Sequence, residues 1–331
     1  MSRQLPEGIA KRLRLPVIAA PMRRVSGPDL VIAACRSGII GSFPTANAGD
    51  ARELGRWLQR IESELSDGDR RFAPWCPNLV IRHGEEKLRR DIEVIVRHGA
   101  EMVITSVGSP APVIEPLHEA GCLVFSDVAT IKHAQKAVDA GADGLVLLTA
   151  GAGGQTGWLN GFAFVRAVRS FFDGPIVLAG GVSDGTALFA AQALGCDLAY
   201  MGTRMIVAEE SMASQDYKNM LLASTADDVV LTRAITGLPT SMLAPSLVAA
   251  GLDPQDLDES ATPAQAREQY SQSKDPDAPQ RWSGIWSAGH SVSGVARIEP
   301  LAKIVAATKR EFDAARRRAR SLVDFPPLSD V

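Results

Sequence analysis

Short apolar runs recur along the first two thirds of the chain, and each follows a segment that ends in glycine. They occur in RHGAEMVITSV (97–107), HEAGCLVFSDV (118–128), DAGADGLVLLTA (139–150), FFDGPIVLAGG (171–181) and ALGCDLAYMGT (193–203). The runs lack polar alternation, which is typical of parallel strands buried on both faces. A glycine before each run favours the left-handed backbone conformation in which many helices end. These glycines are Gly99, Gly121, Gly141, Gly174 and Gly195.

The segments between the apolar runs have the spacing of amphipathic helices, with polar capping residues at their starts. Thr130 is the expected cap of one helix, and Asp184 or Ser183 that of another. Strands that alternate with helices at this period predict a parallel α/β fold. We count eight candidate strands, at residues 16–22, 38–43, 72–80, 102–107, 122–128, 144–148, 175–181 and 198–205.

Eight strand–helix units favour a closed barrel over a doubly wound sheet. A doubly wound sheet normally has its phosphate-binding glycines after the first strand. Here Pro21 and Met22 follow that strand, and the glycine pairs come late. The sequence therefore predicts an α/β fold, a (β/α)8 TIM barrel, over residues 1–224, completed by a C-terminal helix at 300–322. Residues 225–299 break the pattern and predict a smaller, mainly helical cap subdomain that leans over the barrel mouth.

The composition is that of a globular protein, with 46% hydrophobic and 22% charged residues. A net charge of −3 leaves no basic footprint for nucleic acid or for an anionic membrane surface. No apolar run reaches the roughly 18 residues of a membrane span, and the N-terminus lacks the apolar core of a signal peptide. We therefore expect a cytoplasmic protein without nucleic-acid or membrane partners. The four cysteines lie far apart, which indicates neither a disulfide framework nor a metal site.

Two glycine-containing strand ends are the expected phosphate site, because barrels commonly bind phosphates after strands seven and eight. Glycine lets the backbone approach a phosphate closely, and its amide donates a hydrogen bond to the anion. A threonine in the second strand end adds a hydroxyl donor. The predicted phosphate ligands are Gly180, Gly181, Gly202 and Thr203.

A glycine-rich loop follows the sixth strand and spans residues 149–157. Its length makes room for backbone contacts to a flat ligand, but such loops have many uses and the motif alone does not fix the ligand. Gln155 is the side chain of this loop that both donates and accepts hydrogen bonds near a bound molecule. At the end of strand five, Ser126 and Asp127 are candidates to point into the site, with helix capping or loop hydrogen bonding as the alternative.

Taken together, the motifs of the chain resemble the nitronate monooxygenases, formerly called 2-nitropropane dioxygenases. The matching motifs are AAPM (19–22), NLV (78–80), AGAGGQTG (150–157), LAGG (178–181), SDG (183–185), MGTR (201–204) and SAGHSVSG (287–294). The resemblance implies a barrel that binds FMN, with Pro21 and Met22 against the isoalloxazine ring through their backbone and Asn78 in contact with the flavin. The residues expected to bind the cofactor are Ala20, Pro21, Met22, Asn78, Ser126, Gly153, Gly154, Gly180, Gly181, Gly202 and Thr203.

One position of the glycine-rich loop departs from this family. The family typically has Gly-Gly-His there, with the histidine as the base, whereas this chain has Gln155. An amide does not take up a proton at neutral pH, so this residue does not provide general-base catalysis. A second departure is His290, where family members often carry glutamine. Gln155 and His290 are the candidate catalytic residues, with His290 either a relocated base or an ordinary hydrogen-bonding residue of the cap.

Three functions remain open at this point. The first, which the resemblance narrowly favours, is FMN-dependent oxidation of a nitronate, a small substrate that is already an anion. The second is hydride chemistry on an enone or an enoyl thioester such as an acyl-CoA, or reduction of a quinone by NAD(P)H. The third is a barrel that binds a phosphorylated metabolite without redox chemistry. The sequence identifies neither the substrate nor the electron donor and acceptor, and it leaves a homodimer as an open alternative.

Overall fold

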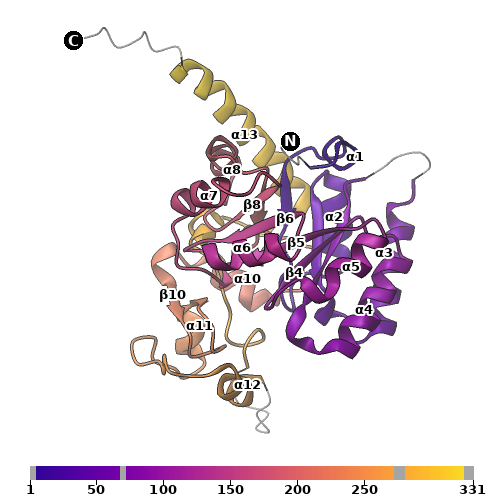
Figure 1. Cartoon of the computed structure of the whole chain (residues 1–331). Helices are drawn as coiled ribbons and strands as arrows, with labels where there is room; N and C mark the ends of the chain where they lie inside the picture. The colour runs from indigo at the N-terminus through magenta and orange to yellow at the C-terminus, as the bar shows by residue number, and fades with distance from the viewer. Residues whose placement is uncertain (1–4, 68–71, 272–279, 324–331) are drawn as a thin grey trace.

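The computed structural model describes residues 5–67, 72–271 and 280–323. Its eight parallel strands form a closed barrel in the order β1-β2-β3-β4-β5-β6-β8-β9, and β9 pairs with β1 to close it. The barrel strands are β1 (Val17–Ala19), β2 (Ile40–Pro44), β3 (Trp75–Val80), β4 (Met102–Ser106), β5 (Leu123–Val128), β6 (Gly144–Leu148), β8 (Ile176–Ala179) and β9 (Leu198–Met201). The predicted barrel is therefore confirmed, and Figure 1 shows helices around its strands.

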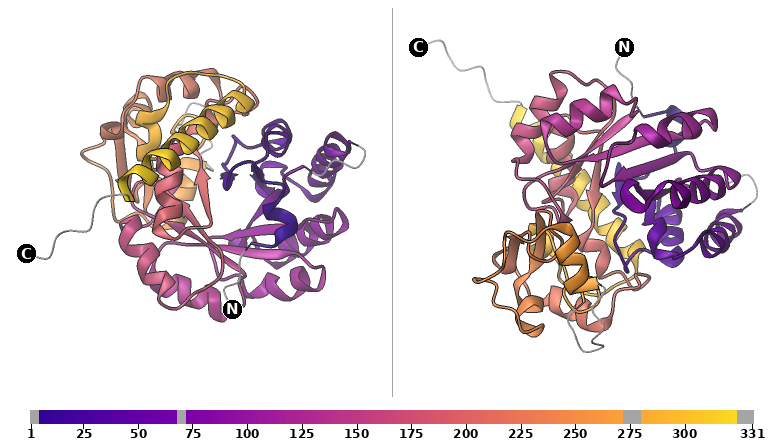
Figure 2. Two further views of the ribbon diagram at one scale, coloured as in Figure 1. Left: turned by 90° about the horizontal axis from the view of Figure 1, so that it is seen from above. Right: turned by 60° about the horizontal axis from the view of Figure 1, so that its bottom comes forward.

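Helices connect consecutive strands and cover the outside of the barrel (Figure 2). They are α2 (Pro28–Ser37), α3 (Ala51–Leu65), α4 (Glu85–Arg97), α5 (Ala111–Glu119), α6 (Ile131–Asp139), α7 (Gly161–Arg169) and α8 (Gly185–Leu194), with the short α1 (Glu7–Ala10) before the first strand. Two predicted caps are in place. Thr130 Oγ1 accepts from the His133 amide at 3.0 Å, and Asp184 Oδ1 accepts from the Ala187 amide at 2.8 Å.

Two details of the predicted strand–helix repeat are wrong. The sequence predicts an eighth strand to residue 205, but β9 ends at Met201 because Gly202 leads the chain into the short helix α9 (Thr203–Ile206). Gly174 does not adopt the positive φ that the other four glycines of the repeat adopt. Instead its carbonyl accepts a hydrogen bond from Arg169 Nη1 at 2.5 Å, so a side chain holds the turn after α7.

The C-terminal helix α13 (Leu301–Val323) packs against α8 and α2. The approach is close at Gly185, where a Cβ atom would lie 2.1 Å from the Phe312 nitrogen and 2.1 Å from the Thr308 carbonyl oxygen. The Gly185 amide also donates to the Glu311 carboxylate at 3.0 Å. The glycine of the SDG motif is therefore required by the packing of two helices.

The segment after β9 forms a cap at the end of the barrel where the strands terminate (Figure 1). It contains α10 (Gln215–Leu222), β10 (Val229–Thr232), β11 (Thr240–Leu243), α11 (Ala244–Ala249) and α12 (Pro263–Ser271). Strand β11 pairs antiparallel with β10 on one side and with β7 (Gly154–Gln155), in the loop after β6, on the other. The sequence did not predict this sheet, because strands of two to four residues carry too little periodicity. The proposed domain boundaries stay a prediction, and residues 1–4, 68–71 and 272–279 of those units lie outside the described residues.

Apolar side chains fill the inside of the barrel as well as the layer between strands and helices. Ile18, Ile40 and Phe125 are among the interior side chains without solvent exposure, so the barrel is a packed core and not a pore. Polar side chains follow at the strand ends, under the cap. Within the described ranges, no helix has the length and apolar character that crossing a bilayer requires.

Candidate active site

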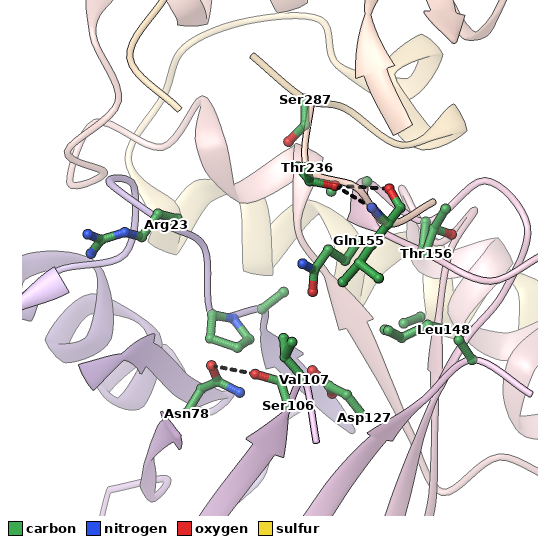
Figure 3. Close-up of a pocket in the computed structure, with 18 of the residues that line it drawn as sticks. Arg23, Asn78, Ser106, Val107, Asp127, Leu148, Gln155, Thr156, Thr236 and Ser287 are labelled. Atoms are coloured by element: carbon green, nitrogen blue, oxygen red, sulfur yellow. Dashed lines mark hydrogen bonds between the residues drawn. The ribbon is translucent and has the colours of Figure 1, made fainter. Parts of the chain in front are cut away.

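A cavity of about 1870 Å³ lies between the C-terminal ends of the barrel strands and the cap (Figure 3). Every residue predicted to bind the cofactor lines it, and so does Gln155. The cap contributes Thr236, Trp286 and Ser287, among others. Residues from the first to the last barrel strand thus meet at the face on which TIM-barrel enzymes carry their active sites.

Gly180 and Gly181 form a tight turn after β8 and have positive φ values of 121° and 73°. A Cβ atom on Gly180 would lie 2.5 Å from the Thr149 hydroxyl oxygen, so the turn fits against the neighbouring loop only with glycine. Among the described residues, neither the Gly181 amide nor the Thr203 amide has an intramolecular acceptor. Two free amides at neighbouring strand ends, on residues that line the same cavity, fit a phosphate group.

The Thr203 hydroxyl links this turn region to the cap. Its oxygen accepts a hydrogen bond from the Gly289 amide at 3.0 Å, which leaves the hydroxyl proton for a ligand. Gly289 lies so close to the glycine-rich loop that its Cβ atom would be 2.5 Å from the Gly151 carbonyl oxygen and 2.8 Å from the Gly153 nitrogen. The SAGH segment is therefore fixed against both the loop and the expected phosphate site.

Four polar side chains at the ends of β3, β4, β5 and β9 form the floor of the cavity. Ser106 Oγ donates to Asn78 Oδ1 at 3.3 Å, and Asp127 lies beside Ser106 (Figure 3). Within the described residues, Asp127 Oδ1 and the Tyr200 hydroxyl are buried and have no hydrogen-bond partner. Burial raises the pKa of Asp127 to about 8 and holds the pKa of Tyr200 well above its usual range. The floor thus contains two polar groups, the Asp127 carboxyl and the Tyr200 hydroxyl, that are available to hydrogen-bond a ligand.

The loop after β1 can contact a ligand with its surface, but both backbone polar groups of Met22 already have hydrogen-bond partners within the protein. The Met22 amide donates to Ser26 Oγ at 3.0 Å, and the Met22 carbonyl accepts from Asn47 Nδ2 at 2.9 Å. Pro21 has no N–H to donate. These two residues are therefore suited to van der Waals contact with a flat ring. Ser126 also borders the cavity, but alternation along β5 turns its side chain away from the face on which its neighbour joins the floor.

Gln155 extends from β7, where pairing with Thr240 of β11 fixes its backbone. Figure 3 shows its amide group projecting into the cavity, between the floor and the cap residues Thr236 and Ser287. An amide at this place orients a ligand by donating and accepting hydrogen bonds. It does not carry a proton away from the ligand.

His290, the second candidate catalytic residue, is not among the described residues that line the cavity. It is exposed, and its amide donates to the Gly151 carbonyl at 2.9 Å. Its ring lies against Gly151, where a Cβ atom would be 2.5 Å from the imidazole Nδ1. The structure therefore brings Gln155 to the cofactor-binding residues and places His290 against the backbone of the loop.

The lining of the cavity is strongly cationic. Its basic residues are Arg23, Arg24, Arg82, Lys87, Lys132, Lys136, Arg267 and Arg281. Among the described lining residues, Asp127 is the one carboxylate. Burial, followed by the nearby guanidiniums of Arg267 and Arg23, lowers the pKa of Arg281, and burial and nearby cations also lower the pKa of His83. Such a concentration of like charge attracts an anionic ligand.

A family model described as nitronate monooxygenase matches residues 61–307. The chain belongs to the nitronate monooxygenase family. It is 27% identical to a nitronate monooxygenase of Paraburkholderia phytofirmans, over 90% of this chain and 92% of that protein. It is also 29% identical to the (3aS,4S,5R,7aS)-5-hydroxy-7a-methyl-1-oxo-octahydro-1H-indene-4-carboxyl-CoA dehydrogenase of Rhodococcus jostii, over 70% of this chain and 64% of that protein.

Two solved structures share the fold of this family member. A nitroalkane oxidase from Streptomyces ansochromogenes has a TM-score of 0.77 and 23% identity, over 95% of this chain and 100% of the other. FabK from Thermotoga maritima has a TM-score of 0.76 and 21% identity, over 96% and 99% of the two chains. The predicted family and the predicted fold are therefore confirmed. The family is one of flavoproteins, and the chain is an oxidoreductase, as the sequence predicted.

Sequence reasoning missed the cationic lining and the free hydroxyl of Tyr200. The basic residues come from segments far apart in the chain, and each alone is typical of a solvent-exposed face. Tyr200 lies inside an apolar run, where it is indistinguishable from a core aromatic. The sequence did mark Asp127 as a candidate. Side chains alternate along a strand, so a carboxylate at the C-terminal end of a barrel strand has about an even chance of pointing into the barrel mouth, where TIM barrels have their active sites.

Proposed function

We propose that the chain is an FMN-dependent oxidoreductase that acts on an anionic substrate in this cavity. The observation that carries the proposal is the meeting of two glycine-containing strand ends, a polar floor and a cationic lining in one cavity. The free amides of Gly181 and Thr203 fit the phosphate of FMN, and Asn78 and Ser106 fit the polar edge of its ring. When bound, the flavin supplies the two-electron redox chemistry that protein side chains lack.

The side chains of the protein then bind and orient the substrate and shield the cavity from water. Gln155 orients the substrate from above, and the cap closes that side of the cavity. Trp286 stacks on Tyr217 with ring centroids 5.1 Å apart, and the Tyr217 hydroxyl donates to the Ser287 carbonyl at 2.5 Å. This stacked pair makes a fixed wall that excludes water. Because Gln155 accepts no proton, the site suits a substrate that is already anionic, or an enoyl thioester that would accept a hydride from the reduced flavin and a proton from solvent.

The cationic lining favours a substrate that carries several phosphates, such as a CoA thioester. The cavity volume of about 1870 Å³ exceeds the roughly 300–1,000 Å³ of ordinary small-molecule sites, so it has room for such a substrate next to a flavin. The relative from Rhodococcus jostii, named as a dehydrogenase of a carboxyl-CoA compound, supports the same class.

Oxidation of a nitronate is the second candidate. The family model that matches this chain supports it. A preformed nitronate needs no proton removed, so the amide at position 155 is no obstacle. The cationic lining serves this candidate as well, because it attracts small anions.

Anaerobic stopped-flow spectroscopy of the purified holoprotein tests both candidates. Propyl-2-nitronate, NADH, NADPH and a set of acyl- and enoyl-CoA thioesters are mixed separately with the protein, and the flavin absorbance is followed. Rapid bleaching by the nitronate alone, reversed by oxygen, would select the second candidate. Bleaching by a CoA thioester, or by a nicotinamide and then reversal by an enoyl-CoA, would select the first. A colourless protein that takes up no FMN would contradict the proposal.

A further inference from the structure

Asp127 is the one carboxylate among the described residues of a cavity lined by cations. It lies on β5, next to Ser106 in the floor (Figure 3), and its Oδ1 atom is buried without a hydrogen-bond partner in the part of the chain that the structure describes. The hydroxyl of Tyr200, on β9, is buried and unpartnered in the same way. Buried polar groups in folded proteins are almost always hydrogen-bonded, so these two groups on one cavity floor are candidates to bind a ligand.

Burial favours the neutral form of Asp127. Among the described residues, Tyr200 of β9 and Cys76 of β3 are the titratable groups that interact electrostatically with Asp127, and β4 contributes the uncharged Ser106 to the cavity. Burial raises the pKa of both Tyr200 and Cys76, so neither carries a charge at pH 7. Burial also raises the pKa of Asp127 to about 8. At pH 7 the Asp127 side chain is therefore a carboxylic acid with a proton to donate.

We propose that protonated Asp127 and the Tyr200 hydroxyl form a donor pair that binds a carbonyl-bearing edge of the flavin ring. This inference rests on the proposed FMN site. The isoalloxazine ring carries carbonyl oxygens on one edge, and these accept hydrogen bonds from a carboxylic acid but are repelled by a carboxylate. The pair belongs to the floor, with Asn78 and Ser106, whereas Gln155 projects into the cavity from the side of the cap.

A dependence of FMN affinity on pH follows from this pairing. The proton stays on Asp127 in the complex, so affinity is complete below the pKa of about 8 and falls as pH rises through it. Between pH 7 and pH 9 the protonated fraction falls about tenfold, and the dissociation constant of FMN is expected to rise about tenfold. The phosphate of FMN, with its second pKa near 6, is already ionised across this window.

The test is a flavin-fluorescence titration of the full chain with FMN at pH 7, 8 and 9. Wild type is expected to show the tenfold rise, while Asp127→Asn, whose amide still donates, binds FMN with a nearly constant affinity. Tyr200→Phe is expected to bind FMN several-fold more weakly at every pH and to keep the wild-type pH dependence. The two variants thus separate Asp127, which loses its proton in this pH range, from the Tyr200 hydroxyl, which keeps its proton throughout.

Three outcomes overturn the inference. Wild-type affinity that stays constant or rises from pH 7 to pH 9 means that Asp127 is not a proton donor to the flavin. An equal pH dependence in Asp127→Asn assigns the titration to another group. No FMN binding by folded protein at any pH removes the proposed function together with the inference, which distinguishes that failure from the other two.

A second measurement applies if Asp127→Asn does not fold. The infrared difference spectrum between wild-type protein with and without FMN, at pH 7, is expected to show a protonated-carboxyl band that shifts when FMN binds. A spectrum without such a band also overturns the inference.

Discussion

At the scale of single residues, Gln155 places an amide where the resemblance of the sequence leads us to expect an imidazole in other members of the family. Its side chain projects into the cavity, while its backbone is held by β11 and the expected phosphate site lies on other strands. We therefore expect Gln155→His to retain FMN and to gain turnover of a neutral nitroalkane. That rate should rise with pH as the imidazole loses its proton near pH 6.5.

Flavin absorbance and the pH profile of kcat/KM for nitroethane check this expectation. Gln155→Asn is the control, since it keeps an amide and adds no base. Loss of flavin from Gln155→His alone would contradict the placement of this side chain away from the phosphate.

The phosphate turn gives a second prediction at this scale. Gly181 has a φ of 73°, and a Cβ atom on it would meet open space, so a side chain there is tolerated sterically but strained in its backbone. Gly181→Asp would put a carboxylate beside the FMN phosphate and should weaken FMN binding by about tenfold or more. Gly181→Asn has the same size, tolerates positive φ and carries no charge, so it isolates the repulsion. The FMN dissociation constants of the two variants, measured by fluorescence, should differ, and equal values would place the phosphate elsewhere.

At the scale of secondary-structure elements, the hydrophobic periodicity predicted the strands and helices of the barrel repeat. It missed the short strands that form only because distant segments of the chain pair with each other. The run GLVLL at 144–148 is recognisable as a strand because its first four residues are buried, on both faces. Strand β7 has only two residues and exists because β11 lies beside it, so no local pattern marks it. The same holds for His290: its position in the SAGH motif was visible, but the side of the loop on which its ring lies depends on the contact with Gly151.

That contact between the cap and the loop also makes a prediction about stability. A Cβ atom on Gly289 would lie 2.5 Å from the Gly151 carbonyl oxygen and 2.8 Å from the Gly153 nitrogen, both backbone atoms. We expect Gly289→Ala to lower the free energy of unfolding by about 1–3 kcal/mol and to weaken FMN retention, because Gly289 also donates to Thr203. Gly284→Ala is the control, since its nearest neighbour would be 3.9 Å away. Urea denaturation of both variants checks this, and equal stabilities would show that the segment moves without cost.

At the scale of the whole molecule, a net charge of −3 conceals a cavity lined by eight basic residues. Composition reports only the sum of charges, whereas the fold gathers cations from the β1 loop, from α4 and α6 and from the cap at one mouth. Most of these cations are also exposed to solvent, so their field extends to the mouth of the cavity. The net charge of the chain therefore gave no sign of a cationic cavity, and the expectation that the protein has no nucleic-acid partner stays a prediction.

Arg281 offers the sharpest test of that field. It is half-buried in the cap, and burial together with Arg267 and Arg23 lowers its pKa, so its charge is held at a cost that an anionic ligand would offset. We expect Arg281→Gln to raise the KM for a CoA thioester about 3–10-fold, as the loss of one phosphate contact implies, and to leave the KM for an uncharged enone unchanged. Lys303→Gln, an exposed cation on α13 outside the cavity, is the control. Added salt should also raise the KM for the CoA thioester, because 0.1 M ionic strength screens charges beyond about 10 Å. Steady-state kinetics of both variants with the two substrates decide the matter: an equal KM change for the thioester and the enone would assign Arg281 to cap folding and remove the electrostatic argument for a phosphate-bearing substrate.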